Sequence, residues 1–297
     1  MIKYKRLASD EYLKYSNMTF PAYRNLLTRL EPAGPYFAVG ALFNGSPAGL
    51  ALGKIHEERK AEVLSVFVDQ NYRCRKIGEG LLSELEKIFK EMNCAECALV
   101  YMTGKPATPM FEKLLLKSGY SDPEFRKLVC RASCKSFLSC GWEKYLKKLP
   151  AEYKIISWNE VSEADREQIR QSNEINKWIA PDLMPFDFEN GCEPINSLAM
   201  RYRGDIVGWV INHRIAFDLI RYTCSFLRPD LQKAGRIVAM YYESLLRQNA
   251  VMPFSHGIWT VPSWHVHMID FARRHMAPHL TSMSETREVK KIIRKAG

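Results

Sequence analysis

The sequence predicts a mixed α/β protein that consists of two similar domains in tandem. The chain has 297 residues, of which 46% are hydrophobic and 11% aromatic, which suits two globular domains with separate cores. Stretches with strand-like and helix-like hydrophobic spacing alternate along the first half. The order of these stretches then recurs in the second half at an offset of 159 positions.

The strands and helices of the first half follow from local patterns. Asn44-Gly45 is a hairpin signal, and residues 61–68 are rich in β-branched and aromatic side chains, as in a buried strand. One helix face is defined by Ile77, Leu81, Leu85, Ile88, Phe89 and Met92. We expect strands at 2–7, 36–43, 48–55, 61–68, 98–102 and 125–132, and helices within 10–30, from residue 77 and at 108–117.

The repeat rests on turn and strand residues that have counterparts 159 positions later. These are Gly45 and Gly204, Gly49 and Gly208, and Phe67 and Phe226. Helical spacing also resumes at Ile237, in the register of the first helix. We therefore expect domains at 1–140 and 153–297, joined by a basic linker at 141–152.

Charge and cysteine usage narrow the class of protein. The net charge is +10, of which residues 1–150 carry +8, and such an excess attracts nucleic acid, anionic membranes or phosphorylated small molecules. No apolar run suits a signal peptide or a membrane span, so we expect a cytoplasmic protein with reduced thiols. Cys94-x-x-Cys97 and Cys130-x3-Cys134 have the spacing of a four-thiolate zinc site. We interpret them instead as buried thiols and expect no metal.

The turn within residues 69–80 is the first feature with functional chemistry. It follows an expected strand and opens an expected helix, so the free N–H groups of a helix N-terminus can bind an anion there. Gly78 and Gly80 allow close backbone approach, and Arg73, Arg75 and Lys76 add positive charge. The turn matches neither a P-loop nor the full Gly-x-Gly-x-x-Gly dinucleotide motif. It therefore predicts a phosphate or pyrophosphate ligand without identifying which.

The same turn resembles the acetyl-CoA signature of the GNAT superfamily of N-acetyltransferases. The signature, Arg/Gln-x-x-Gly-x-Gly/Ala, falls on Arg75, Gly78 and Gly80, between a strand and an amphipathic helix. Residues 105–113 and Gly119-Tyr120 resemble later family elements, so the resemblance covers roughly residues 1–135. It implies acetyl-CoA as co-substrate, bound by Phe67, Val68, Arg73, Cys74, Arg75, Lys76, Ile77, Gly78, Glu79 and Gly80. Pantetheine would pair with the strand that ends at Val68, and the thioester carbonyl would face an N–H group near Phe67 or Val68.

The resemblance also implies a catalytic base. Glu62 resembles the position of the general-base glutamate in the histone-acetyltransferase branch and would accept the proton of the attacking amine, directly or through water. The alternative interpretation is a polar residue at a strand end. Glu57 and Glu58, with His56, are reserve candidates, although we favour the interpretation that they cap an exposed hairpin.

The catalytic acid is less well defined. Many family members use a helical tyrosine to protonate the departing CoA thiolate, and the matching residue here is Phe111. Tyr101, Tyr120 or water are the substitutes that the sequence offers.

The second half departs further from the signature. At the 159 offset Glu62, Arg75, Gly78 and Gly80 fall on Arg221, Ala234, Ile237 and Ala239. We expect this domain to keep the fold, to have lost cofactor binding, and to complete the amine-substrate cleft or pack against the first domain. Residues 176–192, with Trp178, form either a pocket loop or part of an aromatic core, and we favour the core.

These patterns together predict an acetyl-CoA-dependent N-acetyltransferase with a tandem GNAT-like architecture and an active site in the first domain. An amine would attack acetyl-CoA directly in a ternary complex. A non-catalytic acyl-CoA-binding regulatory protein is the alternative, and nucleic-acid binding ranks last because no nucleic-acid motif accompanies the basic half. The acceptor is a small-molecule or peptide amine that the sequence does not identify, no membrane partner is expected, and homodimerisation is left open.

Overall fold

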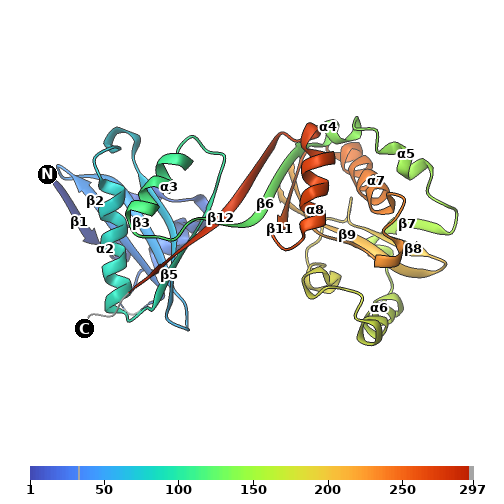
Figure 1. Cartoon of the computed structure of the whole chain (residues 1–297), viewed down its shortest axis with the longest axis horizontal. Coiled ribbons are helices and arrows are strands. Elements are labelled where there is room, and N and C mark those ends of the chain that lie inside the picture. Colours follow the sequence, from blue (N-terminus) through green and yellow to red (C-terminus); the bar gives the residue numbers. More distant parts are fainter. Residues whose placement is uncertain (33, 294–297) are drawn as a thin grey trace. The chain divides into compact units, whose positions relative to one another are not determined.

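A computed structural model describes residues 1–32 and 34–293 of the chain. Contacts within the chain divide the protein into two compact units. Unit 1 comprises Met1–Arg126 and the C-terminal segment from Glu285, and unit 2 comprises Lys127–Ser284. Figure 1 shows a mixed sheet with helices in each unit.

Unit 1 is built on a mixed sheet with the strand order β1-β2-β3-β4-β5-β12. Helices α2 and α3 pack on one face, and α1 with the N-terminal 3₁₀ turns packs on the other. All neighbours are antiparallel except β4 and β5, which are parallel. The bounds are β1 Ile2–Arg6, β2 Tyr36–Phe43, β3 Ser46–Ile55, β4 Lys60–Val68, β5 Glu96–Met102, β12 Ser282–Ile292, α1 Tyr12–Tyr15, α2 Ile77–Glu91 and α3 Thr108–Lys117.

Unit 2 repeats this plan with the strand order β7-β8-β9-β10-β11-β6. Its long helix, α7, packs on one face of the sheet, and α6 lies on the other. The bounds are β6 Glu124–Ser133, β7 Tyr153–Ser157, β8 Leu198–Tyr202, β9 Asp205–Ala216, β10 Leu219–Leu227, β11 His256–Pro262, α4 Cys134–Leu138, α5 Glu143–Lys147, α6 Glu163–Asn176, α7 Arg236–Val251 and α8 Val266–Phe271.

The predicted tandem α/β fold is confirmed at the level of single elements. β4 and β10 have the same length and start 159 positions apart, and so do the 3₁₀ turns Gln70–Tyr72 and Pro229–Leu231 that follow them. The helices α2 and α7 begin at Ile77 and Arg236, again 159 positions apart. The repeat therefore extends to the strand–turn–helix region that carries the proposed cofactor motif.

The two halves of the sequence have exchanged their last strands. β12, at the end of the second half, pairs antiparallel with β5 in unit 1, from Thr286↔Met102 to Ile292↔Glu96. β6, at the end of the first half, pairs with β11 in unit 2. The compact units thus differ from the ranges 1–140 and 153–297, because β-pairing is set by contacts between residues that are distant in sequence.

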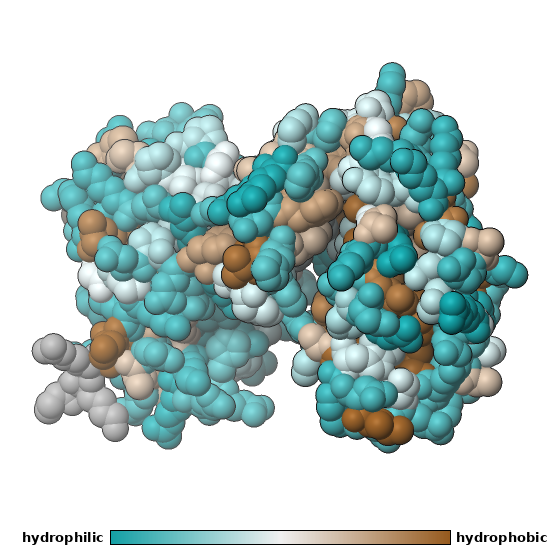
Figure 2. Space-filling view, turned by 45° about the vertical axis from the view of Figure 1, so that its right-hand side comes forward, coloured by the Kyte–Doolittle hydropathy of each residue, from teal (hydrophilic) through white to brown (hydrophobic). Residues whose placement is uncertain are grey.

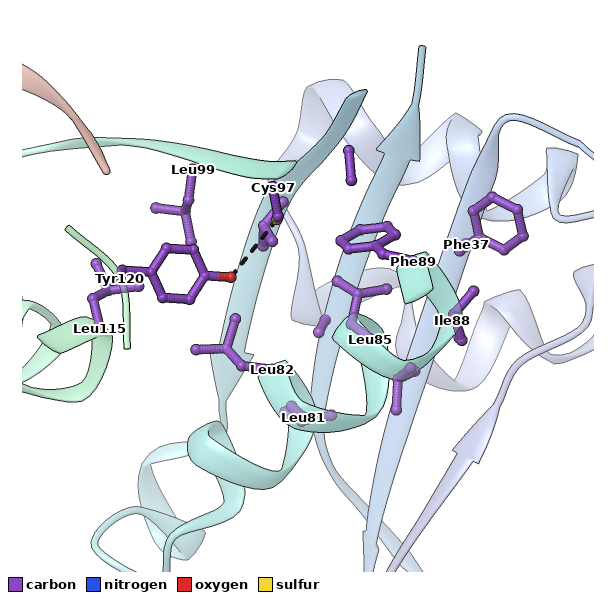
Figure 3. Close-up of a cluster of buried hydrophobic side chains, with 14 of the residues drawn as sticks. Phe37, Leu81, Leu82, Leu85, Ile88, Phe89, Cys97, Leu99, Leu115 and Tyr120 are labelled. Carbon is purple, nitrogen blue, oxygen red and sulfur yellow. Dashed lines mark hydrogen bonds between the residues drawn. The ribbon is translucent and has the colours of Figure 1, made fainter. Parts of the chain in front are cut away.

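The core of unit 1 lies between α2 and the sheet. Phe37, Leu81, Leu85 and Phe89 are buried there, and Figure 3 shows their side chains together with Tyr120, whose hydroxyl lies 3.7 Å from Cys97 Sγ. The face of α2 expected from hydrophobic spacing is buried apart from its last member. Met92 is 36% exposed because the helix ends one residue earlier.

Two local expectations differ from the structure. The segment 10–30 is mostly 3₁₀ turn, with only Tyr12–Tyr15 in an α-helix, since Pro21 and uncapped turn starts limit helix growth. Residues 141–152, expected to be a linker, contain α5, which packs on α7 within unit 2.

The face of the protein shown in Figure 2 is largely hydrophilic, with hydrophobic residues between the hydrophilic ones, some of them next to one another. Among the described residues, no helix is long and apolar enough to cross a membrane. The same residues contain no group of three or more His, Cys, Asp or Glu side chains arranged to hold a metal ion. Cys94, Cys97, Cys130 and Cys134 are all buried free thiols.

Candidate active site

The two parallel strands of unit 1 separate halfway along their length. β4 and β5 pair from Lys60↔Glu96 to Val63↔Leu99, and no pair follows within the described residues. Leu64 is an extra residue at this point, because the register with β3 changes between Gly53↔Val63 and Leu52↔Ser65. The bulge thus coincides with the start of an opening, along which residues 64–68 present one edge of their backbone without a neighbouring strand.

The direction of the backbone groups along this edge can be inferred from Gly49 of β3. A Cβ on Gly49 would come within 2.7 Å of the carbonyl oxygen of Phe67, so the polar groups of Phe67 face β3. Alternate residues of a strand direct their N–H and C=O groups to opposite edges. The backbone groups of Val66 and Val68 therefore face the opening, whereas those of Phe67 do not.

The turn after β4 gathers unpaired N–H groups. The Asp69 side chain accepts from Asn71 N at 2.9 Å and starts the turn, and Cys74 and Lys76 then both have φ near +60°. This left-handed conformation is strained for residues with side chains, and it turns successive N–H groups to one side. In the described part of the chain, no hydrogen bond is donated by the N–H groups of residues 73–79. The turn is therefore a candidate anion site that leads into the N-terminus of α2.

The side chains of the turn supply positive charge at its rim. Arg73, Cys74, Arg75 and Lys76 are all exposed. The Arg73 Nε atom donates to the carbonyl oxygen of Val68 at 3.1 Å and closes the base of the turn. The Arg75 guanidinium lies over the Phe43 ring, 4.8 Å from its centroid, which holds the charge beside the anion site. An exposed thiol and three cations thus surround the unpaired N–H groups.

The two signature glycines have different surroundings. A Cβ on Gly78 would lie 3.1 Å from Leu114 Cδ2, so this residue allows α3 to approach the start of α2. A Cβ on Gly80 would overlap the Tyr4 ring of β1, so Gly80 allows α2 to pack on the sheet. The Gly80 N–H also donates to Lys76 O at 3.1 Å, which makes it unavailable to a ligand, unlike the N–H groups of Ile77, Gly78 and Glu79.

The predicted base lies near the point where β4 and β5 separate. Glu62 is one residue before Val63, the last residue of β4 that pairs with β5. Its Oε2 atom lies 3.0 Å from His56 Nε2, and the side chains of Glu62 and His56 are 34% and 42% exposed. Glu58, a reserve candidate, instead forms an exposed ion pair with Lys60 at 2.6 Å. Of the predicted bases, Glu62 therefore has the better position for proton transfer beside the opening.

The two tyrosines that the sequence offers in place of Phe111 have different surroundings in the structure. The Tyr120 ring is buried in the core, with its hydroxyl beside Cys97 Sγ, and burial above all raises its pKa. Tyr101 lies on β5 past the last pair with β4, and its ring meets Phe111 edge to face at 5.5 Å. Only Tyr101 is therefore placed at the opening.

The turn of unit 2 has the same position but is filled by the chain itself. Gly235 is left-handed like its counterpart Lys76, and a Cβ on Gly235 would overlap the Tyr145 ring of α5. The Arg236 guanidinium donates to the carbonyls of Leu231 and Lys233 at 3.1 and 3.3 Å. Side chains of this chain therefore occupy the position of the anion site of unit 1.

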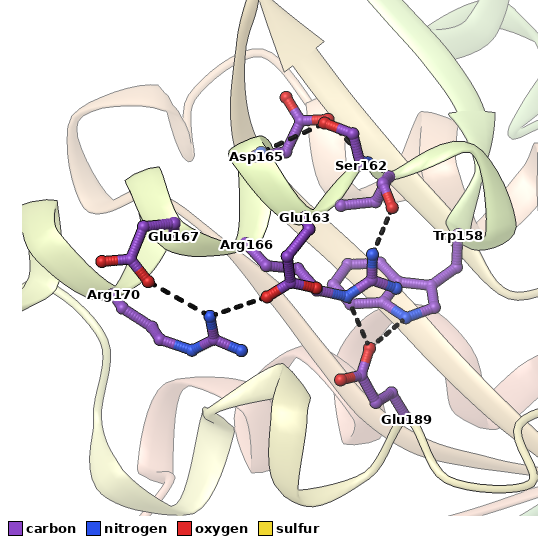
Figure 4. A network of polar contacts seen from close by, with 9 residues as sticks. Trp158, Ser162, Glu163, Asp165, Arg166, Glu167, Arg170 and Glu189 are labelled. Atoms are coloured by element: carbon purple, nitrogen blue, oxygen red, sulfur yellow. Dashed lines mark hydrogen bonds and ion pairs between the residues drawn. The ribbon is translucent and has the colours of Figure 1, made fainter.

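The other face of the unit 2 sheet is closed by aromatic packing. Trp178 and Phe226 lie with Trp209 in one cluster, with ring centroids 5.1–6.0 Å apart. Glu189 fixes the covering segment, because its Oε2 accepts from Trp158 Nε1 and Arg166 Nε, each at 3.1 Å (Figure 4). The aromatic residues of 176–192 thus pack as a core, in agreement with the favoured interpretation.

A family comparison agrees with this geometry. Residues 3–115 match the model of the acetyltransferase (GNAT) family, so unit 1 contains a GNAT acetyltransferase domain. No curated protein matches the chain by sequence.

Similar solved structures extend the likeness in fold to the whole chain. A tandem GNAT protein from the clavulanic acid biosynthesis pathway is 11% identical, with both chains covered completely and a TM-score of 0.62. A GCN5-related N-acetyltransferase from Sphaerobacter thermophilus is 14% identical, with 100% of this chain and 97% of that chain covered, and a TM-score of 0.62. A glucosamine N-acetyltransferase region of a fungal multi-domain β-N-acetylglucosaminidase is 10% identical, with 98% of this chain and 38% of that chain covered, and a TM-score of 0.58. The fold of the chain is therefore that of tandem GNAT proteins.

Sequence reasoning named His56 as a reserve candidate beside Glu57 and Glu58, but it did not predict the contacts of His56, Phe43 and Tyr145 with other elements. His56 beside Glu62, the Phe43 ring under Arg75 and Tyr145 over Gly235 all have partners in other elements. The one available signal was weak: His56 and Glu62 flank a predicted hairpin, and residues at hairpin ends come together.

Proposed function

We propose that the protein is an acetyl-CoA-dependent N-acetyltransferase whose active site lies in unit 1. The observation that carries this proposal is the run of unpaired N–H groups at residues 73–79, next to the free edge of β4. The turn would bind the CoA pyrophosphate, with Arg73, Arg75 and Lys76 as additional cations. Pantetheine would extend along the backbone groups of Val66 and Val68.

The reaction would be direct transfer in a ternary complex. The amine of a small molecule or peptide attacks the thioester carbonyl, and the developing oxyanion accepts a hydrogen bond from a backbone N–H that faces the opening. Glu62, held by His56, takes the proton that the amine releases. The sheet and turn thus orient the acetyl donor, and Glu62 supplies the base.

Cofactor binding is tested by thermal unfolding with and without acetyl-CoA. A ligand at about 100 times its Kd stabilises the folded state by about 2.7 kcal/mol, which corresponds to a shift of several degrees. Gly78→Glu should abolish the shift, because it adds a negative charge at the start of α2 and a side chain where a Cβ would already lie 3.1 Å from Leu114 Cδ2. Ser83→Glu is the matched control, since Ser83 is exposed on the same helix beyond its first turn, and this variant should keep the shift.

Measurement of turnover distinguishes an acetyltransferase from a protein that only binds acyl-CoA. Thiol release from acetyl-CoA is measured with a polyamine, an amino sugar, an aminoglycoside and a lysine peptide as acceptors. Glu62→Gln should lower kcat by about 100-fold or more, while Glu58→Gln, in the exposed hairpin, should keep full activity. A Glu62→Gln variant as active as the wild type would remove Glu62 from the mechanism.

A second candidate function is a non-catalytic acyl-CoA-binding regulatory protein. It is favoured by Phe111, which has no proton to donate at the position where the family resemblance places a tyrosine. An acetyl-CoA-induced thermal shift without thiol release for any amine would support this second function. The absence of both the shift and the thiol release would contradict both functions.

A further inference from the structure

The position of Tyr101 along the opening between β4 and β5 follows from the pairing of these strands. The last parallel pair is Val63↔Leu99, and Tyr101 is two residues further along β5. The same distance along β4, allowing for the bulge at Leu64, leads to Val66. Tyr101 and Val66 also pack against the same core cluster. The Tyr101 ring therefore lies across the opening from the backbone that would hold the thioester end of the cofactor.

The hydroxyl of Tyr101 is held by charged side chains from two other elements. It donates to Glu112 Oε1 of α3 at 2.6 Å, and the same oxygen accepts from Arg287 Nη1 at 3.0 Å. Arg287 in turn makes two hydrogen bonds to Glu285 Oε2, at 3.1 and 3.0 Å. Arg287 belongs to the exchanged strand β12 and is the direct cross-strand partner of Tyr101. The end of the chain thus orients a hydroxyl in unit 1.

We propose that Tyr101 donates a hydrogen bond to the CoA sulfur as the thioester breaks, and that Glu112 and Arg287 are its positioning residues. This inference rests on the proposed function. As the C–N bond forms, the C–S bond breaks and its electron pair passes to sulfur. Glu62 takes the proton of the amine and returns it to solvent, and the thiolate takes a proton from solvent. The Tyr101 hydroxyl rotates from Glu112 to the sulfur and keeps its own proton throughout.

The chemistry of the network suits a donor that stays protonated. Burial, and then the hydrogen bond to Glu112, raise the pKa of Tyr101, so the phenol remains an O–H donor across the neutral range. Arg287 offsets the negative charge of Glu112 nearby. The hydroxyl missing from Phe111 is thereby replaced by one on the ring that touches Phe111.

The first experiment needs no acceptor. The thiol of bound CoA is titrated with pH by its ultraviolet thiolate absorbance in wild type and in Tyr101→Phe. A donor at the sulfur stabilises the thiolate, so the bound thiol should ionise at lower pH in the wild type than in the variant. Tyr120→Phe is the matched control, because it removes a hydroxyl from the core of the same unit, and it should titrate like the wild type. Identical titrations of wild type and Tyr101→Phe would overturn the proposal.

The second experiment removes the hydroxyl of Tyr101 and then introduces a hydroxyl at position 111. Tyr101→Phe should lower kcat for thiol release by about 10- to 100-fold with KM for acetyl-CoA unchanged, as expected for a donor that acts mainly in the transition state. The double variant Tyr101→Phe with Phe111→Tyr should recover much of this loss. A rise in KM with a smaller thermal shift, and no change in kcat, would show a merely structural residue and contradict the proposal.

The positioning role of Arg287 is tested by measuring the ionisation of the bound thiol in Arg287→Lys. Arg287→Lys keeps the positive charge but loses the planar fork that contacts Glu112 and Glu285 together. It should raise the ionisation pH of the bound thiol part of the way toward that of Tyr101→Phe.

If acetyl-CoA gives no thermal shift with the wild type, the proposed function itself fails. If the shift occurs and Tyr101→Phe changes neither thiol ionisation nor kcat, only this inference fails.

Discussion

Arg73 and Gln232 make the same hydrogen bond in the two units. Arg73 Nε donates to Val68 O at 3.1 Å, and Gln232 Nε2 donates to Leu227 O at 2.9 Å, with donors and acceptors each 159 positions apart. In both units a long polar side chain closes the base of the turn on the last carbonyl of the strand. The turns therefore share their construction and differ in what lies above them, which is solvent-exposed cations in unit 1 and Tyr145 in unit 2.

Acetyl-CoA should protect Cys74 from alkylation. The thiol is exposed and lies within the stretch of unpaired N–H groups, so a bound pyrophosphate would cover it. At a concentration about ten times Kd, the rate of maleimide labelling should fall roughly tenfold, measured by peptide mass spectrometry. Cys140 of unit 2 serves as internal control and should react at the same rate with and without ligand. Equal protection of both thiols, or of neither, would argue against ligand binding at the turn.

One acetyl-CoA should bind per chain, in unit 1. Arg75→Ala should weaken binding about tenfold, since it removes one charge-assisted contact. Lys233→Ala removes a cation from the equivalent turn of unit 2 and should leave affinity and stoichiometry unchanged, because Tyr145 and Arg236 fill that turn. Titration calorimetry measures both values. Two sites per chain, or a loss of affinity in Lys233→Ala, would show that the second turn is open.

Removal of residues 285–297 should disable unit 1. This deletion takes away most of β12, including Val289, which is 1% exposed in the core, and leaves β5 without a partner on that side. We expect loss of the acetyl-CoA thermal shift, together with a separate unfolding transition at lower temperature. Lys290→Ala, an exposed substitution on the same strand, should behave like the wild type. A truncated chain with a normal shift would mean that the exchanged strand is dispensable.

The ion pair of Asp165 and Arg201 should make the stability of unit 2 sensitive to acid. The two guanidinium nitrogens each lie 2.7 Å from a carboxylate oxygen, and hydrogen bonds from Arg201, which outweigh the effect of burial, lower the pKa of Asp165. A carboxyl group with a lowered folded-state pKa contributes stability above its unfolded value of about 3.9 and loses it as the pH falls toward the folded value.

Urea unfolding of wild type and Arg201→Ala at two pH values tests this ion pair. At pH ~7 the variant should be less stable by about 2 kcal/mol, because one partner of a largely buried charged pair is removed. At pH ~3 the difference should be smaller, because the wild type has by then lost part of the contribution. A difference that is equal or larger at the lower pH would reverse the assigned sign.

Local sequence patterns predicted much of unit 1 because its elements have strong local causes. β2 and α3 have the predicted bounds, and α2 begins at the predicted residue, since hydrophobic periodicity and turn residues act over a few positions. The segment 10–30 was less predictable, because its conformation depends on packing against the sheet as much as on propensity.

The sequence by itself determined the strand–turn–helix that carries the candidate anion site, and its inexact copy 159 positions later. Gly78, the cations and the helix period are local features, and local features can be read along the chain. The tertiary structure alone decided that Gly80 packs on Tyr4, that Tyr145 fills the second turn, and that Arg287 reaches the first unit. Each of these depends on contacts between residues far apart in sequence, which are selected by the packing of the whole sheet and leave no mark in any short stretch.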